Sequence, residues 1–182
     1  MGPYVLHSMS QAMVRACDDG LPGHTHTEGG EALRRIRVPG TSRPLAMKAM
    51  YLSSNVEGEE SGNLTVFPGS PMRAFPEDPD RAPHPHAPGA GQPQSKAGEG
   101  YLFPHSVRHG PAPCRSGRAR NILLYHFCQK CVRGYDFERT ARVMAQCTPR
   151  QRRLLGDLGY EFRPGSYFHG PLDHTDVILA GG

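Results

Sequence analysis

The stretch Arg118-Ala-Arg-Asn-Ile-Leu-Leu-Tyr-His-Phe-Cys128 is the strongest indication of how this chain folds. It is rich in large apolar and aromatic side chains and follows a turn-rich segment at 109–117. An apolar run of this length, bounded by turn residues, predicts a β-strand. The rest of the fold therefore depends on which other segments resemble strands that lie alongside it.

Four more segments have the composition of short strands. They are residues 4–14, 45–53, 63–67 and 100–104. Turn-forming residues separate them, and glycine and proline together make up 22 + 18 = 40 of the 182 residues. We therefore predict an all-β fold, a double-stranded β-helix (jelly roll), as one domain over residues 1–130.

The pattern changes from Asp136, where strand-like segments give way to short helical ones. Phe137, Ala141 and Met144 recur at helical spacing. Thr148 is followed by proline at the first helical position and by Gln151 at the third, which is the pattern of a capping box. We predict a short C-terminal helical extension and tail over residues 131–182.

Composition limits the possible partners. The net charge is +4, but the basic residues concentrated at 115–153 are mixed with acidic ones and form no stripe interleaved with aromatic residues, so nucleic-acid binding is not expected. No apolar run approaches the roughly 20 residues that span a bilayer, and no secretory signal is visible. We expect no membrane partner and a cytoplasmic location, and the sequence leaves the oligomeric state unknown.

The cysteines are Cys17, Cys114, Cys128, Cys131 and Cys147. An odd number without a disulfide-scaffold spacing fits reduced thiols. The one C-x-x-C pair would need two further ligands to bind zinc, and none is suitably spaced. We predict ordinary thiols at these positions.

A cluster of potential metal ligands lies in Gly23-His-Thr-His-Thr-Glu-Gly-Gly30. On an extended segment, His26 and Glu28 project to the same side, so both can reach one metal ion. His109 would complete a face of two histidines and one carboxylate, the arrangement that leaves positions open for O2 and co-substrate in non-haem Fe(II) oxygenases. Each element alone is equally typical of a solvated polar loop.

Arginines precede and begin the strand at 118–128. An arginine on the inner wall of a barrel can hold a carboxylate through its planar guanidinium. Strand alternation does not choose between Arg118 and Arg120, since both would share a face.

These elements together resemble the phytanoyl-CoA dioxygenase family of Fe(II)/2-oxoglutarate-dependent oxygenases. Residues 62–70 (GNLTVFPGS) resemble the family's NG-x-L-x-x-x-PGS segment, and residues 103–110 (FPHSVRHG) resemble its strand with the distal iron ligand. Residues 115–120 (RSGRAR) resemble the strand with the 2-oxoglutarate arginine. Residue 28 is Glu where the family usually has Asp, Pro71 replaces the His of its PGSH sequence, and only 25 residues precede His26.

The resemblance implies Fe(II) held by His26, Glu28 and His109, with 2-oxoglutarate as co-substrate anchored by Arg120, which lies 120 − 109 = 11 residues after the distal histidine. It implies an enzyme that uses O2 to hydroxylate a small organic substrate, releasing succinate and CO2. The segment 73–96, rich in Pro and Gly, is expected to be a mobile loop at the pocket mouth, with His84 and His86 exposed.

Two other interpretations remain open. In a cupin-type metal enzyme without 2-oxoglutarate, the ligands would be His24, His26, Glu31 and His109. Alternatively, the chain is a truncated, non-catalytic barrel that only binds a ligand.

Overall fold

The computed structural model describes residues 5–17, 23–28, 44–72, 83–132 and 139–157. Its strands are β1 (Val5–Arg15), β2 (Ala46–Leu52), β3 (Leu64–Val66), β4 (Gly100–Pro104), β5 (His109–Pro111) and β6 (Arg120–Gln129). A 3-10 turn, η1, spans Ser70–Met72, and two helices follow, α2 (Ala141–Ala145) and α3 (Pro149–Leu154).

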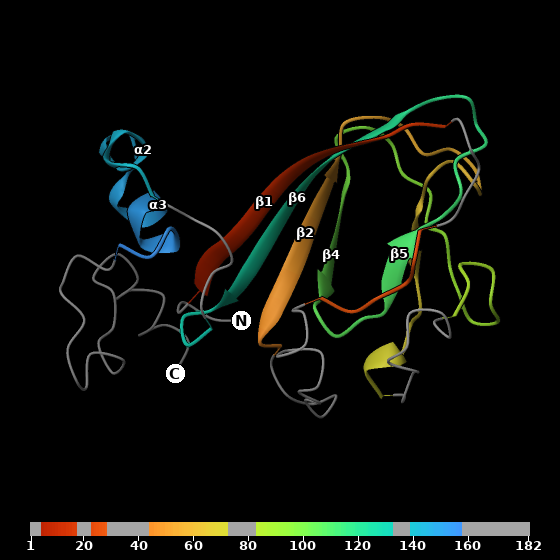
Figure 1. Cartoon of the computed structure of the whole chain (residues 1–182), viewed down its shortest axis with the longest axis horizontal. Coiled ribbons are helices and arrows are strands. Elements are labelled where there is room, and N and C mark those ends of the chain that lie inside the picture. Colours follow the sequence, from red (N-terminus) through yellow and green to blue (C-terminus); the bar gives the residue numbers. More distant parts are fainter. Residues whose placement is uncertain (1–4, 18–22, 29–43, 73–82, 133–138, 158–182) are drawn as a thin grey trace.

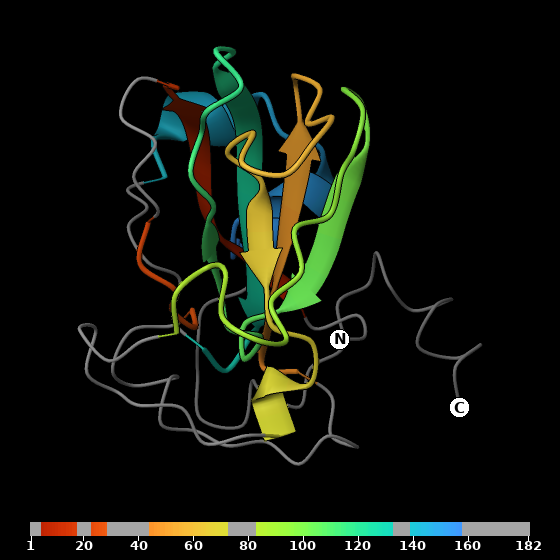
Figure 2. The ribbon, with the colours of Figure 1, turned by 90° about the vertical axis from the view of Figure 1, so that its right-hand side faces the viewer.

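The strands form two antiparallel sheets that lie as two layers. The larger sheet has the order β1-β6-β2-β4, and the smaller one pairs β3 with β5. Figure 2 shows β3 in front of the larger sheet, and Figure 1 shows β5 beyond β4 on the same side. The segment around His26 extends the smaller sheet through a bridge to His109. The predicted double-stranded β-helix with short late helices is confirmed.

Strand β6 is central to this arrangement because it pairs with β1 on one side and β2 on the other. Its burial alternates strictly, with Arg120, Ile122, Leu124, His126 and Cys128 buried. Alternate side chains of a strand point to the same face, so these five face the smaller sheet. The hydrophobic core between the layers consists of Met50, Leu52, Val56, Leu64, Phe103, Ile122 and Leu124.

The two helices lie beyond β1, on the far side of the larger sheet from β5 (Figure 1). Thr148 caps α3 as predicted: its hydroxyl accepts from the Gln151 amide, and the Gln151 side chain accepts in return from the Thr148 amide. The buried Arg153 of α3 donates to the Val5 carbonyl of β1 at 3.4 Å. None of the helices in the described segments is long and apolar enough to cross a membrane.

Two expectations from the sequence need correction. Residues 109–111 were predicted as part of a turn-rich segment, but they form β5, because their backbone pairs with Leu64–Val66. Cys17 and Cys114 were predicted as reduced thiols, but the structure pairs them as a disulfide, with Cα atoms 4.6 Å apart. Pairing of β1 along β6 brings these residues together over a separation of 97 positions, which local pattern does not reveal.

The buried histidine of β6 gives a testable acid sensitivity. Burial lowers the pKa of His126 to about 4. The unfolded chain takes up a proton near pH 6.5 and the folded protein does not, so stability present above this pH is lost as the pH falls. The wild type should therefore lose unfolding free energy as the pH falls from 6.5 to 5. His126→Asn should lose about 2 kcal/mol less over the same pH range. Urea denaturation with a chelator present measures this.

The same substitution at His24, whose side chain is exposed, is the control for replacing a histidine with asparagine. Equal slopes for the wild type and His126→Asn would contradict the assignment of this acid sensitivity to His126.

Candidate metal centre

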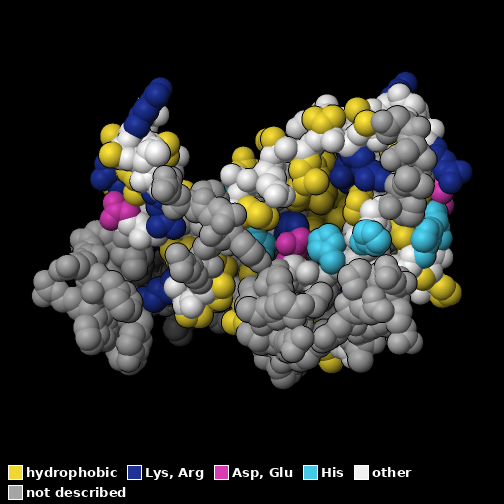
Figure 3. All heavy atoms as spheres, in the orientation of Figure 1, with side chains coloured by type: hydrophobic (Ala, Val, Ile, Leu, Met, Phe, Trp, Pro, Cys, Tyr) yellow, Lys and Arg dark blue, Asp and Glu magenta, His cyan; other side chains and the backbone are white. Residues whose placement is uncertain are grey.

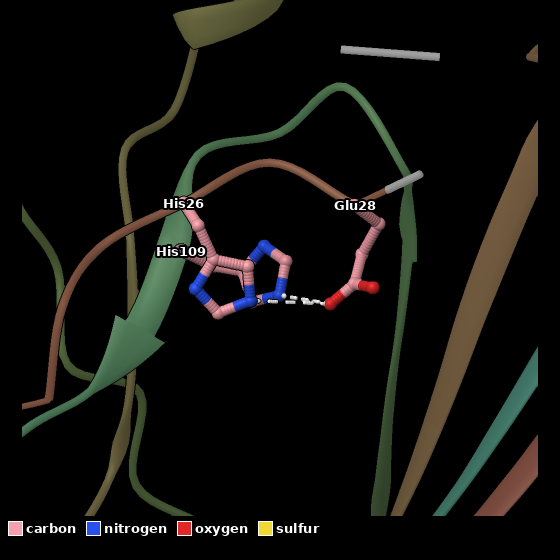
Figure 4. Close-up of side chains that lie close together, drawn as sticks. All are labelled: His26, Glu28 and His109. Atoms are coloured by element: carbon pink, nitrogen blue, oxygen red, sulfur yellow. Dashed lines mark hydrogen bonds and ion pairs between the residues drawn. The ribbon is translucent and has the colours of Figure 1, made fainter. Parts of the chain in front are cut away.

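Titratable side chains gather across the middle of one face of the molecule, next to a hollow lined by hydrophobic side chains (Figure 3). His26, Glu28 and His109 each direct one ligand atom to a shared point, and these atoms lie within 4.8 Å of one another. Glu28 Oε1 is 3.3 Å from His26 Nε2 and 3.1 Å from His109 Nε2. The two imidazoles lie side by side and face the carboxylate (Figure 4).

The backbone explains why the three side chains meet. His26 and His109 are opposite each other across an antiparallel bridge, with N–H···O distances of 2.7 and 2.8 Å. Directly opposed residues project to the same side of a sheet, so their rings lie 4.7 Å apart. The Glu28 amide donates to the His105 carbonyl at 3.0 Å, which holds the end of this segment beside β4.

Hydrogen bonds to the far nitrogens prepare both imidazoles to bind a cation. His109 Nδ1 lies 2.9 Å from the Val107 carbonyl, and His26 Nδ1 lies 3.2 Å from the His24 carbonyl. A carbonyl only accepts, so each Nδ1 carries the hydrogen, and in the neutral ring Nε2 presents its lone pair. In that state two lone pairs face the Glu28 carboxylate, which is unfavourable unless a cation lies between them; without a cation, a protonated ring can instead donate its Nε2 hydrogen to Glu28.

The spacing also fits a metal ion. Two ligand atoms at right angles, each about 2.1 Å from a metal, lie about 3.0 Å apart. The observed N···O separations of 3.3 and 3.1 Å are close to this value. The donor set of two imidazoles and one carboxylate is that of non-haem Fe(II) sites. Glu28 and each of the two histidines are therefore spaced like neighbouring ligands of such an ion.

The electrostatics favour an ionised carboxylate next to a neutral imidazole. Burial would raise the pKa of Glu28, but hydrogen bonds from His109 and His26 and the nearby Lys48 charge hold it well below its usual range. Burial lowers the pKa of His109, although its hydrogen bond to Glu28 opposes this. These are the protonation states that a metal ligand needs.

The cluster opens into a cavity of about 450 Å³. Its wall includes the apolar side chains Met50, Leu64, Ile122 and Leu124 from the two layers. Arg120 also lines the cavity. The cavity is therefore an apolar chamber with the ligand cluster and a guanidinium on its wall.

Arg120 is buried, with 5% of its surface exposed, and its Nε has no hydrogen-bond partner. Across the described segments, no carboxylate pairs with it. Burial, together with the Arg15 charge, lowers its pKa to about 10. Arg118, in contrast, is 81% exposed on the surface near Glu57. The structure thus directs only Arg120 into the cavity, because β6 begins there.

Lys48 is a neighbour of the cluster that the sequence analysis did not single out. Its Nζ contacts Glu28 Oε1, and its side chain is only 6% exposed. A signal was present: Lys48 lies between Ala46 and Met50 on the same face of an apolar strand. A charged residue at such a position is rare without a partner.

Other expectations can now be compared with the structure. His24 is exposed and does not join the cluster, while Glu31 lies outside the described residues. In the segment 83–96, Ser95 pairs with Val56 and Gly91 pairs with Val66 through backbone hydrogen bonds, and none of these residues lines the cavity. The expectation of a loop at the pocket mouth stays a prediction, and residues 73–82 lie outside the described residues. Two histidines of this segment, His84 and His86, are exposed as predicted.

Comparison with known proteins gives a match at the level of the fold. No protein-family model and no curated protein matches the sequence. HygX from Streptomyces hygroscopicus, solved with nickel and 2-oxoglutarate bound, has a TM-score of 0.59 and 14% identity, over 76% of this chain and 64% of HygX. SnoK, a non-haem α-ketoglutarate-dependent carbocyclase from nogalamycin biosynthesis, has a TM-score of 0.51 and 18% identity.

The SnoK match covers 69% of this chain and 50% of SnoK, so the chain spans less than two thirds of either protein. At these identities the likeness establishes the double-stranded β-helix fold. The structural neighbours are Fe/2-oxoglutarate-dependent enzymes, and the comparisons do not single out the phytanoyl-CoA dioxygenase family among them.

Proposed function

We propose that the chain is an Fe(II)- and 2-oxoglutarate-dependent oxygenase of the phytanoyl-CoA dioxygenase type. The observation that carries the proposal is the convergence of His26, Glu28 and His109 in a cavity that also contains the buried Arg120. A two-histidine, one-carboxylate face leaves three positions for co-substrate and O2. A buried guanidinium without a carboxylate partner is costly unless an anion binds it.

In this proposal the protein supplies ligands, a counter-charge and an apolar cavity. His26, Glu28 and His109 would hold the iron, and Arg120 would pair with the far carboxylate of 2-oxoglutarate. Bound Fe(II) would supply the redox chemistry that joins O2, co-substrate and substrate. The apolar wall of the cavity offers water few polar partners beside the reacting atoms.

The balanced reaction is substrate C–H, O2 and 2-oxoglutarate giving substrate C–OH, succinate and CO2. Glu28 favours hydroxylation, since family halogenases have a small residue at this position to admit halide. A cavity of about 450 Å³ suits a small organic substrate. HygX, which has been solved with nickel, 2-oxoglutarate and hygromycin B bound, supports a small-molecule substrate by analogy.

Anaerobic titration tests the proposal. Fe(II) followed by 2-oxoglutarate should produce a weak visible charge-transfer band, because the keto and carboxylate oxygens of the co-substrate chelate the iron. Glutarate, which lacks the keto group, is the matched control and should produce no band. A folded protein that binds Fe(II) but gives no band with 2-oxoglutarate would instead support the cupin-type interpretation.

A further inference from the structure

A buried lysine contacts the carboxylate of the candidate metal centre. Lys48 lies on β2, opposite His126 of β6 and Phe103 of β4, so it is enclosed by strands on both sides. Only 5% of its surface is exposed. In the described part of the chain, the one acceptor that its Nζ contacts is Glu28 Oε1. A buried ammonium needs such a partner, because burying an unpaired charge is costly.

The lysine uses the same carboxylate oxygen as the histidines. Glu28 Oε1 lies against His26 Nε2, His109 Nε2 and Lys48 Nζ, whereas Oε2 has no hydrogen-bond partner among the described residues. A metal ion held by both histidines would bind this oxygen too. The metal and the Lys48 ammonium would then lie against the same oxygen, so each cation weakens the attraction of Oε1 for the other.

We propose that Lys48 is an internal counter-cation, which neutralises Glu28 when the metal centre is empty and weakens metal binding by competing for the carboxylate. The proposal rests on the metal site of the proposed function. It distinguishes Lys48 from a residue that merely orients a ligand, because an orienting residue would strengthen metal binding.

Lys48 is expected to lower metal affinity in two ways. Without the lysine, the metal-free protein would hold Glu28 as a buried charge with less compensation, and breaking such a pair destabilises a protein strongly. With a metal bound, the lysine places a like charge next to a divalent ion, which is unfavourable. Both effects predict that removing the ammonium favours the metal-bound state.

The test is Lys48→Met, which keeps the length of the side chain and removes its charge. Isothermal titration with Ni²⁺ at pH 8 should give a dissociation constant lower than wild type by about tenfold or more. The metal-free variant should melt at a lower temperature than wild type, and saturating Ni²⁺ should raise its melting temperature by a larger amount.

Two controls separate charge from packing. Lys48→Arg keeps a cation next to Glu28, so its Ni²⁺ affinity should stay near that of the wild type. Lys96 is exposed, and Lys96→Met should change neither Ni²⁺ affinity nor stability. If Lys48→Met does not fold without metal, Lys48→Gln decides the question, because it removes the charge and keeps a polar group.

The outcomes distinguish this inference from the proposed function. If His26→Ala loses Ni²⁺ affinity while a folded Lys48→Met variant binds Ni²⁺ as weakly as the wild type or more weakly, the metal centre stands and the counter-cation role is overturned. If the wild type and Lys48→Met both fail to bind any divalent ion, the metal centre itself is overturned. Tighter binding by Lys48→Met and not by Lys48→Arg supports the inference.

Discussion

Replacing Arg120 with alanine is expected to weaken 2-oxoglutarate binding by about 2–5 kcal/mol, the scale for truncating one side of a buried charge pair. The guanidinium lines the cavity, and no carboxylate of the described segments pairs with it. Loss of this cation would leave the far carboxylate of the co-substrate in an apolar chamber without a partner. Titration of the Ni²⁺-loaded protein with 2-oxoglutarate measures the change.

Arg118→Ala is the matched control, because it removes the same side chain two residues earlier, where it is 81% exposed. Its 2-oxoglutarate affinity should equal that of the wild type. Metal affinity should be retained in both variants, since neither arginine belongs to the ligand cluster. Unchanged co-substrate affinity in Arg120→Ala would remove the main reason for assigning a 2-oxoglutarate enzyme.

Replacing His109 with alanine should lower metal affinity by more than about a hundredfold, because loss of a mere partner of a metal ligand already costs 10–100-fold. His109 is buried at the start of β5, and its Nε2 faces Glu28 at 3.1 Å. No other histidine of the described segments joins His26 and Glu28 within ligand distance. Titration with Ni²⁺ or Co²⁺, followed by calorimetry, measures the loss.

His24→Ala is the corresponding control. His24 is exposed and lies outside the cluster, so this variant should bind the metal like the wild type. If His24→Ala lost affinity and His109→Ala did not, the ligands would be those of a different site. Loss of affinity in both variants would instead favour the cupin-type set, in which His24 and His109 are both ligands.

Local sequence patterns were sufficient for much of the fold. Strand β4 has the predicted bounds, and β6 begins two residues later than its predicted segment and ends one residue after it. These strands can be predicted from the sequence because an apolar run and its flanking turn residues span only a few consecutive positions. The Thr148 cap was readable for the same reason, since its hydrogen bonds join neighbours along the chain. The local pattern did not indicate β5, because its three residues acquire their partner only from β3.

The site residues also fall into two groups, those that local spacing indicated and those that only the tertiary structure placed. The spacing in His-Thr-Glu indicated that His26 and Glu28 share a side, because alternation along an extended segment is a local property. His109 was only a weak candidate by itself, and the choice of Arg120 over Arg118 was expected only through the family resemblance. The physical reason for both is tertiary. The bridge between His26 and His109 sets the rings side by side, and the start of β6 turns Arg120 inward.

The sequence by itself determined the class of fold and a short set of residues able to bind a metal, since composition and periodicity carry that information. Only the tertiary structure decided that Lys48 contacts Glu28 and that Cys17 meets Cys114. Both contacts join positions far apart along the chain, and they exist because strand register brings those positions together. Long-range pairing of this kind has no local signature in a single sequence.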